Sequence, residues 1–337
     1  MQRDNDLLRQ PTLTDMIRDF DTDGGLKLVN AGILPEKSVV GQSITWDIER
    51  AQRDVAQFEG KHSKSTPRKL SVIGQRAANL ARSFKSTQIA GSYLMDLRNP
   101  GTMDRQRIAQ DEVGRETLQL RNVFDRQDEF MIAGAIQGLL NITIDGIAHS
   151  IDYGFAADHK FAPATPAANI PTLWSDPTAD VIDDLTRILK RVALDSGAAL
   201  SDAWTSRDVI AAILKNNAFL NYFGQTPAGA EAIRTGTISG FFGLNWHVYE
   251  GTYQNDGGPV TLHVPAEKII FTPPARPENY MAVGTDVAKD GEALTEVQGL
   301  YEYSTVTDDP PGINLFAGKV RLPIIRRPDV FATASVL

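Results

Sequence analysis

The chain has 337 residues, 42% of them hydrophobic, which is enough for one large domain or two medium domains with a buried core. Its 34 basic and 42 acidic residues give a net charge of −8, which argues against tight binding of nucleic acid, because that affinity comes mainly from Lys and Arg on phosphates. The sequence has no cysteine, so disulfides, thiolate zinc sites and iron–sulfur clusters are excluded.

Residues 1–36 are predicted to form an N-terminal arm. They are polar and charged and lack the apolar run of a signal peptide. Leu13, Ile17 and Phe20 have the spacing of one short helix, so we expect the arm to dock on another surface. No stretch of the sequence reaches the roughly 18 apolar residues of a membrane span, and we expect a soluble protein without membrane contact.

Residues 37–84 are predicted to form a long, extended β-hairpin. Its first strand shows an even spacing of apolar residues, at Val40, Ile44, Trp46 and Ile48. A strongly polar segment follows, with a tip rich in Lys and Ser. Two strands with so few apolar residues bury little surface, so the hairpin needs an outside partner to be ordered. The alternative is a hairpin that is free in solvent.

Residues 102–137 carry a strong helical signal. Five apolar residues recur at alternating spacings of seven and four and share one face: Val113, Leu120, Phe124, Met131 and Ala135. The opposite side is charged, and Gly138 marks the end. Such a helix of about 32 residues is about 48 Å long, much longer than the usual globular helix of about 11 or 12 residues. We expect a structural girder.

The rest of the chain is predicted to hold a hairpin, a linker and a compact region. The hairpin turns at Asp145-Gly146, and a loop rich in Pro and Ala follows it. Asp176-Pro177 is interpreted as the cap and first position of the next helix, which ends near Gly197. Further helices are expected at 206–223 and 227–235, strands at 244–253, 260–264 and 268–272, and a strand-rich end at 280–337.

The sequence shows no motif for catalysis, a cofactor or a metal. It contains neither a phosphate-binding G-x-x-x-x-G-K-[ST] loop nor a G-x-S-x-G nucleophile elbow. Asp19, Asp21 and Asp23 match the opening of a calcium loop, but Asn30 stands where a bidentate Glu is required. No ligand spacing is found among the histidines, which are His62, His149, His159, His247 and His263. We interpret His247 and His263 as ordinary residues on the two arms of one hairpin at 245–274.

The order of the elements resembles the Hong Kong 97 phage capsid fold. Within that fold, the chain resembles the major capsid proteins of lambda-type tailed phages, the protein E family. The likeness is sharpest at Tyr249, Gly251 and Tyr253, which are followed by Gly257-Gly258, Pro265 and the segment KIIFTP. The final segment, LPIIRRPDVFATASVL, is also similar. Elsewhere the resemblance lies in the order of the elements.

The resemblance implies an α+β fold with five parts. These are an N-terminal arm at 1–36, an extended loop at 37–84, a peripheral domain at 85–174 that contains the spine helix, an axial domain at 175–310 and a return strand at 311–337. It also implies a structural protein, not an enzyme, that assembles into the hexamers and pentamers of an icosahedral shell around double-stranded DNA. The net negative charge suits an inner wall that holds DNA without gripping it.

The resemblance further implies where the chain acts and what it meets. We expect assembly in the host cytoplasm, a final place in the virion, and scaffold, portal and decoration proteins as partners. The extended loop is expected to contact an adjacent subunit through a set of residues that comprises Trp46, Ile48, Phe58, Lys61, Lys64, Arg68 and Lys69. Two alternatives stay open: an encapsulin-like compartment and a soluble α+β enzyme whose site leaves no motif.

Overall fold

In the computed structural model, the chain folds into two compact units. Unit 1 comprises residues 1–44, 78–131 and 280–323, and unit 2 comprises residues 45–77, 132–279 and 324–337. For residues 72–73, 105–109 and 308 the backbone alone is described. The described residues are 8–21, 23–51, 72–90, 105–144, 147–163, 168–238, 240–254, 258–291, 293–308 and 311–337. The five-part division expected from the sequence stays a prediction.

Unit 1 contains a five-stranded sheet, with a parallel pair at one edge. In order, it consists of β1 (Glu36–Ser38), β13 (Tyr280–Val283), β17 (Pro311–Ile324) and β16 (Tyr301–Asp308), and β4 (Ala81–Ala90) also pairs with β17. The long strand β17 pairs antiparallel with both β16 and β4 over residues 312–318. It is therefore the central strand of the unit, and its inward-facing Leu315 and Ala317 are fully buried.

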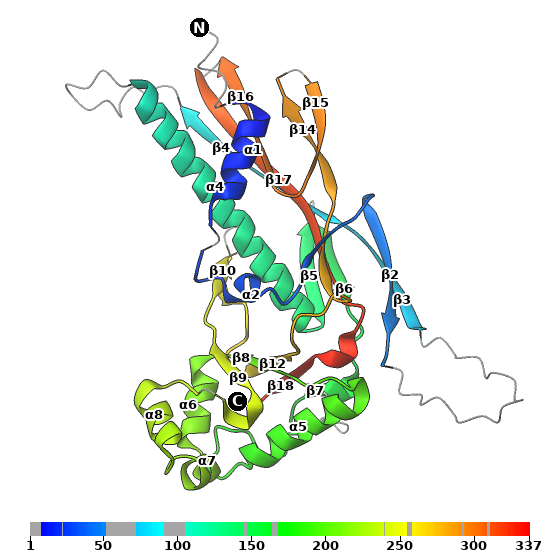
Figure 1. Cartoon of the computed structure of the whole chain (residues 1–337), viewed down its shortest axis with the longest axis vertical. Helices are drawn as coiled ribbons and strands as arrows, with labels where there is room; N and C mark the ends of the chain where they lie inside the picture. The colour runs from blue at the N-terminus through cyan, green and yellow to red at the C-terminus, as the bar shows by residue number, and fades with distance from the viewer. Residues whose placement is uncertain are drawn as a thin grey trace, which may run out of the picture. The chain divides into compact units, whose positions relative to one another are not determined.

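Two N-terminal helices belong to unit 1, and the first of them contributes to its core (Figure 1). Helix α1 (Gln10–Asp19) buries Leu13 and Ile17 completely, and the Oγ1 of Thr14 both donates to the carbonyl oxygen of Glu302 and accepts from its N–H, at 3.1 and 3.2 Å. The arm therefore docks on β16. The short helix α2 (Lys27–Asn30) is capped by Glu129, whose carboxylate accepts from the N–H groups of Leu28 and Val29.

The expected long helix is confirmed as α4 (Arg105–Ile136), 32 residues in one uninterrupted run. All five members of its predicted apolar stripe are buried, none being more than 3% exposed. The helix ends before Gly138, whose φ of +88° is unfavourable for residues with a Cβ. A Cβ at this position would also lie 2.7 Å from the ring of Phe155.

Unit 2 contains a second five-stranded sheet flanked by helices. Its strand order is β7 (Lys160–Phe161), β18 (Ala332–Ser335), β12 (Lys268–Thr272), β8 (Asp202–Thr205) and β9 (Asn245–Val248). The helices are α5 (Val181–Ser196), α6 (Arg207–Lys215), α7 (Asn217–Tyr222) and α8 (Pro227–Thr235). The core of the unit brings together Trp174, Leu185, Ile213, Phe219 and Phe271, which come from these helices, the sheet and the segment that precedes α5.

Four two-stranded ribbons complete the described fold. They are β2 (Ser43–Glu49) with β3 (Val72–Asn79), β5 (Leu139–Ile144) with β6 (Ile147–Asp152), β10 (Thr252–Gln254) with β11 (Val260–Leu262), and β14 (Thr285–Asp290) with β15 (Ala293–Gln298). Short 3-10 turns lie at η1 (Ala157–His159), η2 (Phe241–Gly243) and η3 (Pro328–Val330). The predicted hairpin around 140–151 is confirmed as β5–β6, and its expected turn at Asp145-Gly146 lies outside the described residues.

Three local predictions are wrong, and the first two concern helices. Helix α5 begins at Val181 with Asp180 as its cap, because the Asp180 carboxylate accepts from the N–H of Asp183; Asp176 instead accepts from Thr178 in a preceding turn. The helix expected at 206–223 is two helices, divided at Asn216, whose ψ is 133°.

The hairpin expected at 245–274 is divided between two sheets. Strand β9 pairs in parallel with β8, β10 pairs with β11, and β12 returns to the centre of the large sheet. His247 therefore contacts Asp202 and stacks on Trp204, whereas His263 lies against Tyr249 and Tyr253. These are separate environments, and the two histidines are not a pair across one hairpin.

Candidate subunit-contact surfaces and buried polar sites

The β2–β3 ribbon is anchored at its base in unit 2. Trp46 is 4% exposed and packs on Tyr153, with 6.4 Å between the ring centroids. Ile48 is 6% exposed and lies below Gly154, where a Cβ would come within 3.0 Å of the Ile48 side chain. Gly154 has a φ of +72°, so both its conformation and its position favour glycine.

Polar contacts reinforce this anchor. Arg76 on β3 donates to the carbonyl oxygen of Asp152, and the Glu49 N–H donates to the carbonyl oxygen of Arg326 at 2.9 Å. The side chains of Glu49 and Arg326 also form an ion pair. The hairpin therefore leaves the body of unit 2 from a fixed base.

The predicted contact residues of the extended loop fall into two groups. Trp46 and Ile48 belong to the anchored base, and their side chains are almost fully covered by the chain itself. The others lie outside the described residues: Phe58, Lys61, Lys64, Arg68 and Lys69. The role of all seven in subunit contacts stays a prediction.

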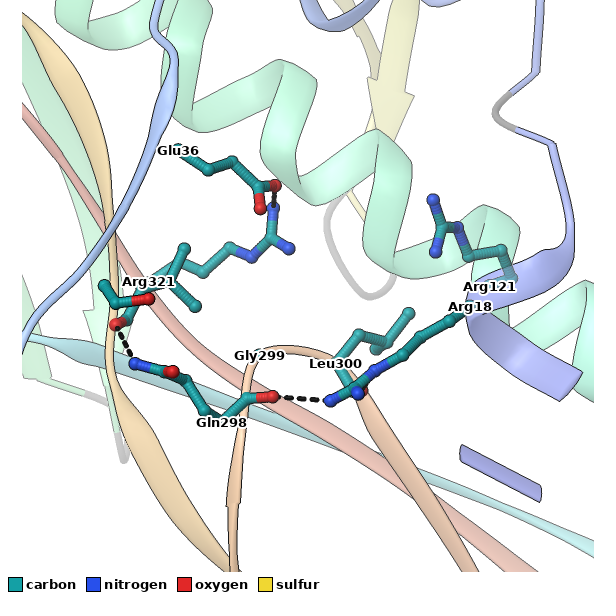
Figure 2. A pocket seen from close by; sticks show the side chains of 9 residues that line it. Arg18, Glu36, Arg121, Gln298, Gly299, Leu300 and Arg321 are labelled. Carbon is teal, nitrogen blue, oxygen red and sulfur yellow. Dashed lines mark hydrogen bonds and ion pairs between the residues drawn. The ribbon is translucent and has the colours of Figure 1, made fainter. Parts of the chain in front are cut away.

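A polar cavity of about 510 Å³ lies in unit 1 (Figure 2). Three arginines from three elements line it, and each is already engaged. Arg18 donates to the carbonyl oxygens of Gln298 and Leu300 at 2.5 and 2.7 Å. Arg121 pairs with Asp125 at 2.8 Å, and Arg321 pairs with Glu36 at 2.6 Å. Arg121 also donates to the carbonyl oxygen of Ile17 at 3.3 Å. The arginines therefore join α1 to α4, α1 to the β15–β16 connection and β17 to β1, and they brace the fold.

A buried ion-pair network fastens β17 to α4. Lys319 is 1% exposed, and its Nζ lies 2.5 Å from Asp128 and also donates to the carbonyl oxygen of Phe124. Arg321 binds the other carboxylate oxygen of Asp128 at 2.9 Å. Burial lowers the pKa of Lys319 to about 8, while the Asp128 carboxylate opposes that shift. Sequence reasoning missed this network, although the alternation of Leu315, Ala317 and Lys319 places the lysine on the inward face.

Glu302 is a second buried ionisable group in unit 1. It is fully buried on β16, where the hydroxyl of Thr117 donates to Oε1 at 3.1 Å. Its Oε2 has no hydrogen-bond partner among the described residues. Burial raises the pKa of Glu302 to about 8, and the Thr117 bond opposes that shift only in part. A carboxyl group in this setting is held mainly in its neutral form at pH 7.

One cluster has the composition of a metal site. The ligand atoms of Asp158, His159 and Asp195 lie within 4.8 Å of one another. Arg191, however, pairs with both carboxylates, and its Nε lies 2.7 Å from Asp195. His159 itself bonds to Asp195 at 3.2 Å and to the carbonyl oxygen of Phe331 at 3.0 Å. A guanidinium already occupies the place of a cation, so the cluster ties η1, α5 and the segment before β18 together.

Large apolar side chains are exposed on the ribbons and on the edge of a sheet. The exposed fractions are 62% for Ile147 on β6, 52% for Val287 on β14, 76% for Leu294 on β15 and 71% for Val306 on β16. A single exposed apolar residue needs no explanation, whereas contiguous apolar patches mark contact surfaces. In the described part of the chain, no helix combines the length and apolarity needed to cross a membrane.

Comparison with known proteins agrees with this architecture. The family model for phage major capsid protein E matches residues 12–336. No curated protein matches the sequence significantly. A provisionally assigned prophage capsid protein of Escherichia coli CFT073 has a similar fold, with a TM-score of 0.63 and 14% identity over 98% of this chain and 99% of that one.

Two further solved structures have the same fold. A phage-related protein of Bordetella bronchiseptica RB50 superposes with a TM-score of 0.57 and 12% identity, over 97% of each chain. The capsid protein of the Myoviridae phage XM1 gives a TM-score of 0.52 and 10% identity, over 94% of each chain. The α+β capsid fold implied by the resemblance is thereby confirmed.

The family match decides between the functions that the sequence left open. It extends over nearly the whole chain, and its members are structural shell proteins. It therefore supports a phage capsid protein over an encapsulin-like compartment and over a soluble enzyme. The chain belongs to the phage major capsid protein E family, whose members build the shell of the virion.

Proposed function

We propose that the chain assembles into hexamers and pentamers of a closed icosahedral shell, and that the hairpin at 37–84 clamps neighbouring subunits. The observation that carries the proposal is the anchored β2–β3 ribbon. In the described residues its strands pair only with each other, and most of their side chains beyond Trp46 and Ile48 are at least partly exposed. A ribbon with so little buried surface is marginal by itself, so a partner surface is required.

Within this proposal, the predicted contact residues have two different roles. Trp46 and Ile48 act indirectly, because their buried side chains fix the direction in which the hairpin leaves unit 2. The direct contacts come from Phe58 and the basic residues of the tip. These residues, Lys61, Lys64, Arg68 and Lys69, meet an acidic patch on the adjacent subunit.

Electron microscopy and sedimentation of the full-length chain test the proposal. Wild-type protein should give closed shells, or rings of five and six. A variant that lacks residues 58–68 should give capsomers that fail to close. A second variant with Gly and Ser in place of 58–68 keeps the length of the loop, and it should also fail if the side chains make the contact. Normal shells from both variants would show that the hairpin is not the clamp.

We extend the proposal to the partners and the place of assembly. Shells form in the host cytoplasm with a scaffold protein and a portal, a decoration protein binds the finished lattice, and the interior holds double-stranded DNA. The support is membership of the capsid family together with the net charge of −8. Co-expression with the candidate scaffold gene of the same phage should raise the yield of closed shells. An unchanged yield would contradict a scaffold requirement.

A further inference from the structure

The β14–β15 hairpin of unit 1 presents one face to solvent. Its register places Val287 opposite Glu296 and Lys289 opposite Leu294. Directly opposed residues of an antiparallel pair share a face, as do residues two apart on one strand, so these four side chains lie together. All four are exposed, Val287 by 52% and Leu294 by 76%.

The other face of the hairpin is anchored within the unit. Ala288 is fully buried, and the carboxylate of Asp286 accepts hydrogen bonds from Arg82 and from the Tyr301 hydroxyl, both at 2.6 Å. Figure 1 shows the hairpin beside β16 and β17, at the same end of the unit as α1. These contacts fix the hairpin, so the orientation of its free face is fixed as well.

The free face has a pattern that complements itself. The two apolar side chains, Val287 and Leu294, occupy one diagonal of the four positions, and the opposite charges of Lys289 and Glu296 occupy the other. Neither charge forms an ion pair with any residue that the structure describes. We propose that this face is an isologous contact between two copies of the chain, related by a two-fold axis along the Val287–Leu294 diagonal. The proposal rests on the self-assembly described above.

The choice of axis follows from the positions of the charges. Rotation about the apolar diagonal places each valine on valine, each leucine on leucine, and each lysine on the glutamate of the other copy. An axis along the charged diagonal would place lysine on lysine and glutamate on glutamate. An axis parallel or perpendicular to the strands would cover each apolar side chain with a charge. Rotation about the favoured axis makes the strands of the two hairpins cross at a steep angle, as in orthogonal packing of sheets.

A second copy fits the face better than a different partner because the surface carries its own complement. An isologous contact requires a self-complementary surface, and the four side chains of this hairpin supply one without a second kind of protein. Stacked sheets lie about 10 Å apart, a gap that the long side chains of Lys289 and Glu296 bridge from both sides.

Charge reversal with mixing tests the contact. Lys289→Glu and Glu296→Lys each oppose like charges across the axis, so each variant alone should assemble at least about tenfold less well than the wild type. In an equimolar mixture, the two glutamates of one variant face the two lysines of the other variant. Assembly of the mixture should therefore recover to within about twofold of the wild type. Mixing cannot relieve repulsion inside one hairpin, so recovery reports a contact between copies.

Two measurements control this experiment. Thermal unfolding of each variant checks that the isolated chain still folds. Thr295→Glu and Thr295→Lys change the charge of the same strand on its other face, and they should assemble like the wild type. Wild-type assembly by the single variants, or a mixture that assembles no better than they do, would overturn the proposal.

Cysteine cross-linking gives an independent readout, because the natural chain has no cysteine. A bis-maleimide with a span of about 10 Å, the spacing of stacked sheets, should link Val287→Cys to itself and Leu294→Cys to itself. Lys289→Cys and Glu296→Cys should each give little product alone and a strong product when mixed. Shells without this pattern would contradict the contact and leave the proposed function intact. Failure of the wild type to form any oligomer would instead contradict the proposed function.

Discussion

At the scale of single residues, two of the buried ionisable side chains of unit 1, Lys319 and Glu302, are in different situations. Lys319 has Asp128 as a counter-ion, whereas the carboxyl group of Glu302 has the Thr117 hydroxyl as its one hydrogen-bond partner among the described residues. Burial shifts the pKa of both groups, but only Lys319 has an opposite charge that stabilises its charged form. The two positions therefore predict different responses to substitution and to pH.

Glu302→Gln should stabilise the protein at alkaline pH. The pKa of Glu302 is raised from its ordinary value near 4.5 to about 8, so the native state holds a proton that the unfolded state releases. The free energy of unfolding should fall as pH rises through this window, because each step favours the unfolded, ionised form. The variant removes the ionisation and should gain roughly 2 kcal/mol over the wild type at pH 8.5, with little gain at pH 4.5.

Urea unfolding at the two pH values measures this difference. Thr117→Val is a useful companion, because it removes the hydroxyl that bonds to Oε1 and leaves the ionisable group. A Glu302→Gln variant whose stability changes with pH in parallel with the wild type would exclude this carboxyl as the source of the dependence.

Lys319 and Asp128 should respond asymmetrically to substitution. Lys319→Met removes the buried ammonium, and Asp128 keeps Arg321 as its partner at 2.9 Å. Asp128→Ala removes the carboxylate that pairs with the Lys319 ammonium and leaves the carbonyl oxygen of Phe124 as its hydrogen-bond partner among the described residues, so it should lower the free energy of unfolding by about 3–5 kcal/mol. The loss from Lys319→Met should be clearly smaller. Equal losses in chemical denaturation would mean that the two partners are equally dependent on each other.

At the scale of elements, Asn216 decides how a helical segment is divided. Its side-chain oxygen accepts from the N–H groups of Ala218 and Phe219, which caps α7, and its amide donates to the carbonyl oxygens of Pro177 and Ala179. The residue is fully buried. A single asparagine thus ends α6, begins α7 and holds both to the turn before α5.

Asn216→Ala should lower the free energy of unfolding of the protein by about 2–4 kcal/mol, because it removes a helix cap and the two hydrogen bonds that the buried amide donates to Pro177 and Ala179. Asn217→Ala, at the adjacent exposed position, is the matched control and should change stability by less than about 0.5 kcal/mol. Thermal or chemical unfolding distinguishes the two. Similar effects at both positions would mean that the bonds of Asn216 contribute little.

Elements with strong periodicity were predictable from the sequence, and elements set by local capping were not. Val113 through Ala135 specify α4 because five apolar residues on one face leave no competing interpretation. The prediction of one helix at 206–223 failed because apolar periodicity continues across Asn216, whose side-chain oxygen starts a new helix by capping the N–H groups of Ala218 and Phe219. Asp176-Pro177 has the sequence of a helix start, but Asp180 is better placed to accept from a helical N–H.

The same contrast holds for the contact surfaces. Trp46 and Ile48 were found by strand alternation, which reports burial without naming the partner, and both proved to be covered by the chain itself. The β14–β15 face escaped notice because Val287, Lys289, Leu294 and Glu296 form a pattern only after the register of the hairpin is known. The sequence of one strand alone does not show which residue of the other strand lies opposite.

At the scale of the whole molecule, the charge of the chain predicts weak binding of DNA. With a net charge of −8, the protein has no excess of cations to release counterions from duplex DNA. Dissociation constants weaker than about 100 μM are expected at 0.15 M salt. Filter binding or fluorescence anisotropy with a random duplex checks this. Binding in the nanomolar range would contradict the view that the shell encloses DNA without gripping it.

The place of β18 in the sheet of unit 2 has a consequence for the order of folding. Residues 332–335 follow β7 and β12 in the chain, yet they lie between these two strands and pair with both. Phe331, Ala332 and Ala334 are at most 1% exposed, so the core of unit 2 stays open until they are in place. Because β7 at residues 160–161 finds its partner only at residues 333–334, the two must come together across a long stretch of chain. Closure of this sheet is therefore expected late in folding, after the helices between them have formed.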